Sequence, residues 1–75
     1  MITDHDIKKK LSENFPDADI VANDLTGGGD HWEVRIKSPA FCGKSLVEQH
    51  QMVYRALGSW MKKEIHALQL FTSES

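Results

Sequence analysis

The sequence predicts an α+β fold in which a three-stranded mixed sheet carries its helices on one face, in the order α-β-β-α-α-β. Three observations support this fold class. Apolar side chains recur at helical spacing in residues 4–15 and 46–57, apolar and charged side chains alternate in 31–38, and shorter apolar segments occupy 18–25 and 67–72. With 75 residues, the chain has room for one small domain, which we assign to residues 1–75.

The first helix is expected over residues 4–15. Ile7 and Leu11 stand four apart, so both side chains lie on one side of a helix, and Thr3 or Asp4 can cap its first turn. Pro16 should end this helix, because the residue before a proline is disfavoured in the α region.

The clearest strand covers residues 31–38. Trp32, Val34 and Ile36 point to one face and the charged residues between them to the other, which is typical of a half-buried antiparallel strand. Between this strand and the weaker one at 18–25 lies the run Gly27-Gly28-Gly29. Three glycines between two strands predict a flexible hairpin loop, and no helix follows them that would bind a phosphate.

The longest helix should begin after Ser45, which forms a capping box with Glu48, and should stop at Gly58. A short helical segment at 59–64 then leads into the last strand, 67–72. One stripe of the long helix is mostly apolar and is expected to face the core, with a hydrogen-bonded histidine in it: Leu46, Val47, His50, Val53, Tyr54 and Leu57.

Charge and cysteine content limit the classes of protein to consider. The net charge is −2, whereas a domain that binds nucleic acid by charge alone is usually strongly basic. The single cysteine, Cys42, excludes an internal disulfide and is expected to be a small, half-buried apolar residue. No apolar signal segment follows Met1, and no apolar run approaches the roughly 20 residues of a membrane span. We therefore expect a cytoplasmic protein without membrane contact.

No catalytic motif is complete. Gly43-Lys44-Ser45 resembles the end of a nucleotide-binding loop, but that motif needs a glycine at the position occupied by Ser38. Cys42 has no recognisable nucleophile signature around it. We expect a protein that is not an enzyme.

Two histidines stand at the ends of predicted elements. His31 follows the glycine run at the start of a strand, and His66 lies between the short helical segment and the last strand. They could converge on a metal ion, but a structural zinc site takes four ligands and a catalytic one usually takes three from the protein. From spacing alone, the pair is an incomplete metal site.

The C-terminal half resembles the BolA family, in particular its shorter bacterial IbaG-like members. The family pattern F-x-G-K-S-L-V-x-R-H-x-x-V-Y-x-x-L, followed by I-H-A-L, is matched by "FCGKSLVEQHQMVYRAL" and "IHAL". The segment "GGGDHWEV" also fits, and Gln49 departs from the usual arginine or lysine. The resemblance implies a fold similar to class II KH domains, in agreement with the element order above.

The same resemblance implies a partner and a cofactor. BolA-like proteins pair with monothiol glutaredoxins and share a bridged [2Fe–2S] cluster with them. The glutaredoxin supplies a cysteine and a bound glutathione thiol, and the BolA-like protein supplies the histidine of I-H-A-L and a Cys or His from the loop between the first two strands. Carried over to this chain, these ligands are His66 and His31. We do not expect the cluster in the isolated chain, which should be a monomer or a weak homodimer.

Other functions stay open at this point. The family has also been treated as KH-like, DNA-binding regulators of stress or morphology genes, and Lys44, Arg55, Lys62 and Lys63 are the candidate nucleic-acid contacts here. A KH domain clamps nucleic acid with a GxxG loop, and the comparable stretch Gly43–Leu46 lacks the second glycine. A third possibility is an interaction module whose histidines bind no metal. Cys42 is also open as an alternative ligand.

Overall fold

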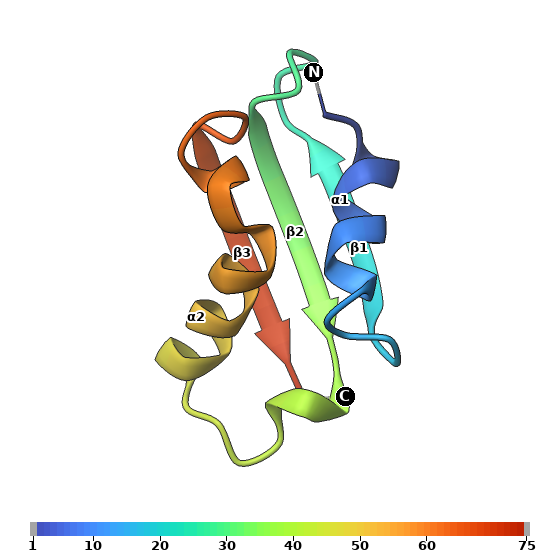
Figure 1. Ribbon diagram of the computed structural model, residues 1–75, viewed down its shortest axis with the longest axis vertical. Helices are drawn as coiled ribbons and strands as arrows, with labels where there is room; N and C mark the ends of the chain where they lie inside the picture. Colours follow the sequence, from blue (N-terminus) through green and yellow to red (C-terminus); the bar gives the residue numbers. More distant parts are fainter. Residues whose placement is uncertain (1, 75) are drawn as a thin grey trace.

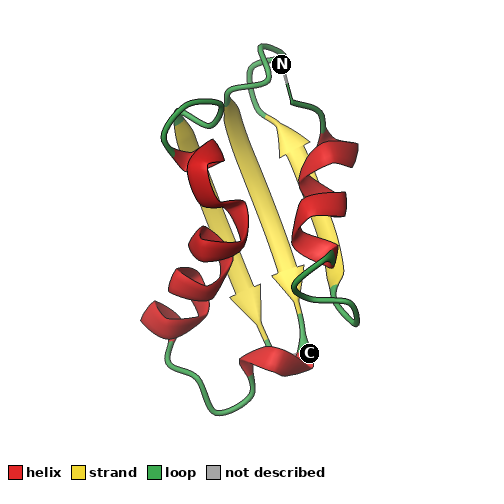
Figure 2. Ribbon diagram, in the orientation of Figure 1, coloured by secondary structure: helices red, strands yellow, loops and turns green. Residues whose placement is uncertain are grey.

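The computed structural model describes residues 2–74, in which two α-helices and two short 3₁₀ helices accompany a three-stranded sheet (Figure 1). Both α-helices cover the same face of the sheet, and its other face is open (Figure 2). The elements in chain order are α1 (Asp4–Ser12), β1 (Asp19–Asp24), β2 (His31–Lys37), η1 (Pro39–Phe41), α2 (Leu46–Leu57), η2 (Gly58–Met61) and β3 (Ala67–Ser73). The predicted fold class is confirmed.

The sheet is mixed, with β2 in its centre. β1 runs antiparallel to β2, with Asp24 opposite Trp32, and β3 runs parallel to β2, with His31 opposite Ala67. A parallel neighbour requires a crossover, which α2 and η2 provide. As a consequence, β2 and β3 start at the same end of the sheet.

One hydrophobic core lies between the sheet and the helices. β2 alternates as predicted, burying Trp32, Val34 and Ile36. The helices contribute fully buried aliphatic side chains to the same core: Ile7 and Leu11 from α1, and Val53 and Leu57 from α2. α1 and η2 are also joined at the surface, where the Lys10 ammonium lies 4.7 Å from the centre of the Trp60 ring.

The first helix is shorter than predicted. Regular α-helix ends at Ser12, and residues 13–15 form a turn in which the Phe15 N–H still donates to the Leu11 carbonyl at 2.9 Å. This turn directs Phe15 into the core, where its ring lies 5.3 Å from that of Phe41. Pro16 thus follows the last helical hydrogen bond, but burial of Phe15 ends the regular helix earlier.

The caps of α2 are as predicted, and the elements around it are not. Ser45 and Glu48 form the capping box, and Gly58 ends the helix with a φ of 59°. The expected helical segment at 59–64 is only the 3₁₀ turn η2, and η1 was not anticipated, although Pro39 occupies its first turn.

The predicted apolar stripe of α2 is only partly buried. Val53 and Leu57 have no exposed surface, whereas Leu46 and Val47 are 60% and 67% exposed and Tyr54 is also exposed. The first turn of α2 extends beyond the edge of β3, so its side chains do not reach the core (Figure 1). The expectation of a hydrogen-bonded His50 is wrong: its Nε2 is buried without a partner among the described residues.

None of the helices within residues 2–74 has the length and apolar character needed to cross a membrane.

Replacing Ser45 with alanine should destabilise the fold by about 1 kcal/mol, because the hydroxyl that accepts from the Glu48 N–H is lost. Urea unfolding measures this difference. Ser59→Ala is the matched control, since no side-chain capping bond is made at η2. Equal destabilisation by both substitutions would contradict the capping role.

Stability should also fall in acid, in part through Glu48. The Ser45 backbone N–H donates to its carboxylate, and this bond, with the Ser45 hydroxyl, lowers the pKa of Glu48 from its ordinary 4.5. A carboxyl whose pKa is lower in the folded state stabilises the fold above its unfolded-state pKa and loses this contribution as the pH falls through the folded value. The melting temperature of Glu48→Gln should therefore fall less steeply than that of the wild type below pH 4.5. Parallel curves would contradict this assignment.

Candidate metal centre

The loop between β1 and β2 is hydrogen-bonded to the side chain of Asp24. Its carboxylate accepts three backbone N–H groups, from Thr26 at 3.3 Å and from Gly27 and Gly29 at 2.9 Å each. Gly27 and Gly29 have φ angles of 81° and 77°, a region that side chains with a Cβ rarely adopt. The expected hairpin connection is confirmed, and its flexibility stays a prediction. The glycines permit a defined conformation, which Asp24 then holds.

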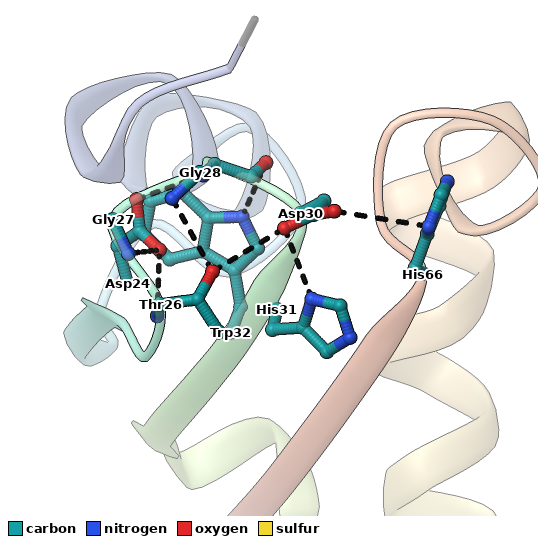
Figure 3. Close-up of polar contacts among 9 residues, drawn as sticks. Asp24, Thr26, Gly27, Gly28, Asp30, His31, Trp32 and His66 are labelled. Carbon is teal, nitrogen blue, oxygen red and sulfur yellow. Dashed lines mark hydrogen bonds and ion pairs between the residues drawn. The ribbon is translucent and has the colours of Figure 1, made fainter.

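A buried tryptophan attaches this loop to the core. The Trp32 side chain is 2% exposed, and its indole N–H donates to the Gly29 carbonyl at 3.0 Å (Figure 3). Because the indole is packed between sheet and helices, the end of the loop has a fixed position relative to the core. Asp30 and His31 lie between Gly29 and Trp32 in the chain. The hydrogen bond from Trp32 to Gly29 therefore also positions the backbone of His31.

The parallel pairing of β2 and β3 brings His31 and His66 together. The residue after His66, Ala67, lies opposite His31, and the His66 N–H donates to the Asp30 carbonyl at 2.8 Å. The centres of the two imidazole rings are 6.3 Å apart, with the rings nearly perpendicular. Two histidines 35 positions apart in sequence thus form one pair on the surface (Figure 3).

A carboxylate that the sequence did not single out lies between the rings. Asp30 Oδ1 is 2.9 Å from His31 Nδ1, and Asp30 Oδ2 is 3.8 Å from His66 Nδ1 (Figure 3). The hydrogen bond with His31 lowers the pKa of Asp30, partial burial opposes this, and the charges of both imidazoles when protonated add to the lowering. The only feature of the sequence that could have placed Asp30 in this site was its position directly before His31, at the end of the glycine run.

The pair is accessible, and it offers two ligands. The side chains of His31 and His66 are 43% and 65% exposed. Within residues 2–74, no group of three or more His, Cys, Asp or Glu side chains is placed to hold a metal ion. The donor set therefore fits a centre that takes two imidazoles from this chain and its remaining ligands from another molecule.

Cys42 is not part of this pair. Cys42 directly follows η1 and is exposed, contrary to expectation. η1 follows the far end of β2, about 20 Å from His31 along the strand, so Cys42 cannot join the two imidazoles within one chain (Figure 1).

The four candidate nucleic-acid contacts lie in two separate segments of the chain. Lys44 and Arg55 line one shallow pocket, together with the acidic Glu48. Lys62 and Lys63 follow η2, beyond the C-terminal end of α2. DNA binding by these residues stays a prediction.

Comparison with known proteins assigns the family. The family model described as "BolA-like protein" matches residues 6–75. This chain belongs to the BolA family. Human BolA-like protein 3 is 45% identical over 65 residues, which are 84% of this chain and 60% of the human protein. This BolA-like chain thus corresponds to less than two thirds of the human protein.

Solved BolA structures share the fold. A bolA protein homologue from Coxiella burnetii is 36% identical, with a TM-score of 0.81 over 97% of this chain and 91% of that one. The BolA domain of SufE1 from Arabidopsis thaliana is 29% identical, with a TM-score of 0.84 over 95% of this chain and 91% of that domain. The BolA fold therefore also occurs as a domain of a SufE-like protein.

Substituting Asp24 with alanine should release the loop. We expect amide hydrogen exchange at Gly27 and Gly29 to accelerate about tenfold or more, because each N–H loses a charged acceptor. Exchange measured by NMR tests this. Asp19→Ala, at the other end of β1, is the control and should leave both amides protected. Unchanged exchange in Asp24→Ala would show that the glycines hold the loop without the carboxylate.

Proposed function

We propose that this BolA-family protein is a partner of a monothiol glutaredoxin and shares a bridged [2Fe–2S] cluster with it, acting in iron–sulfur cluster trafficking or assembly, or in iron regulation. In this proposal the protein is not an enzyme. His66 is the principal ligand on this chain and His31 is the second. The observation that carries the proposal is the accessible pair of imidazoles, 6.3 Å apart at one end of the sheet.

The number of ligands supports a shared centre. A [2Fe–2S] cluster takes four ligands besides its bridging sulfides, and two histidines can replace two cysteines on one of its irons. This chain offers two imidazoles, and a glutaredoxin cysteine with a glutathione thiol completes the set. When bound, such a cluster supplies one-electron chemistry or a transferable iron–sulfur unit, and imidazole ligation raises its reduction potential.

His31 and His66 differ in how firmly their backbone is held and in how accessible their rings are. The backbone of His31 is held by the hydrogen-bonded loop before it and by the buried Trp32 after it. His66 is more exposed and lies in the connection between η2 and β3, where a partner can approach it. Both imidazoles must be neutral to bind iron, so acid should weaken the holo complex.

The relatives support a general role in iron–sulfur metabolism. A SufE-like protein of Arabidopsis thaliana carries a BolA domain, which is consistent with a function related to iron–sulfur clusters. The proposed glutaredoxin partner and the bridging ligands depend on the pair of histidines.

Mixing the protein with a monothiol glutaredoxin, iron, sulfide and glutathione should give a heterodimer with the visible absorption and circular dichroism of a [2Fe–2S] cluster. His66→Ala should abolish this spectrum, because the cluster loses its principal ligand on this chain, and His31→Ala should weaken it. His5→Ala is the control, since His5 lies on α1, outside the site.

A cluster spectrum that survives in His66→Ala would overturn the ligand assignment. A heterodimer whose affinity does not change with iron and glutathione would instead identify an interaction module that binds no metal.

A further inference from the structure

The Asp30 carboxylate lies against the Nδ1 side of both imidazoles, with one oxygen toward each ring (Figure 3). We propose that Asp30 is a positioning residue that fixes the tautomer of His31 and orients His66, so that both rings offer Nε2 to a metal. The metal-binding part of this inference rests on the function proposed above. The effect on the tautomer concerns the isolated chain and stands independently of it.

The tautomer of His31 follows from the chemistry of its partner. An aspartate on the protein surface is ionised at neutral pH, and an ionised carboxylate can only accept hydrogen bonds. At a separation of 2.9 Å, His31 Nδ1 must therefore carry the proton and donate it. A neutral imidazole protonated on Nδ1 has its free electron pair on Nε2, which becomes the only ligand atom of that ring.

His66 is held to the same residue by its backbone. The Asp30 carbonyl accepts the N–H groups of His66 and Ala67, at 2.8 and 3.3 Å. The contact between Asp30 Oδ2 and His66 Nδ1 is 3.8 Å, too long for a hydrogen bond. In a neutral His66 ring, the carboxylate favours the form with the proton on Nδ1, because the N–H dipole then points at the negative charge. Asp30 thus orients the His66 ring more weakly than the His31 ring.

Asp30 itself has little freedom. The Thr26 hydroxyl donates to Asp30 Oδ1 at 3.4 Å, and a Cβ on Gly28 would lie 3.2 Å from the same oxygen. The glycine therefore leaves the space that the carboxylate needs. This arrangement matches the general pattern in which a metal-bound histidine donates its other ring N–H to a carboxylate, which fixes the tautomer and raises the basicity of the ligand.

The first test uses the isolated, ¹⁵N-labelled protein about two pH units above the ordinary histidine pKa, where neutral imidazole dominates. Long-range ¹H–¹⁵N spectra distinguish a protonated from an unprotonated ring nitrogen. In the wild type, His31 Nε2 should have the shift of an unprotonated nitrogen. Asp30→Ala should move His31 toward the Nε2–H form, and Asp17→Ala, an exposed acid outside the site, should not. An unchanged His31 tautomer in Asp30→Ala overturns the proposal.

The second test uses the heterodimer with a monothiol glutaredoxin and follows the loss of the cluster spectrum to a chelator. Asp30→Ala should weaken retention of the cluster about 10- to 100-fold, as is usual when the hydrogen-bond partner of a metal ligand is removed. Asp30→Asn, which keeps an oxygen acceptor but removes the charge, should raise the reduction potential of the cluster.

The outcomes separate the two proposals. If the wild type forms no cluster with the glutaredoxin, the proposed function fails, and the tautomer measurement still decides the role of Asp30 in the isolated chain. If the wild type forms the cluster and Asp30→Ala retains it equally well, Asp30 does not position the ligands, and this inference is wrong.

Discussion

The parallel pairing of β2 with β3 is the constraint on which the rest of this structure depends. Parallel neighbours cannot be joined by a tight turn, so the chain must cross the sheet through α2 and η2 before β3 begins. The crossover returns the chain to the end of the sheet where β2 starts. His66, the last residue before β3, therefore arrives beside His31, the first residue of β2.

A second feature converts this proximity into a defined site. The β1–β2 loop carries Asp30 and His31, and it is held from both sides: Asp24 binds its backbone, and Trp32 ties it to the core. A side chain buried in the core thus determines where a surface imidazole lies. Rigid support of this kind is what a ligand site needs, because a displacement of even 1 Å weakens it.

The parts predicted correctly are those that depend on local patterns. Alternation in β2, the capping box of Ser45 and the helix stop at Gly58 each involve residues within a few positions of one another. The errors occur where a side chain meets a distant part of the chain. Phe15 ends α1 early because Phe41 receives it in the core. Val47 stays in solvent because α2 extends beyond β3.

The sequence by itself determined the fold class, the BolA family motifs and the two candidate ligands, His31 and His66, because all of these are recorded in local periodicity and in short spaced identities. Only the tertiary structure decided that the Asp24 carboxylate binds the backbone of the glycine loop and that Asp30 lies against both rings. These contacts depend on the register between β2 and β3, which are distant in the sequence, and on the backbone conformation of the β1–β2 loop. No pattern along the chain records either of them.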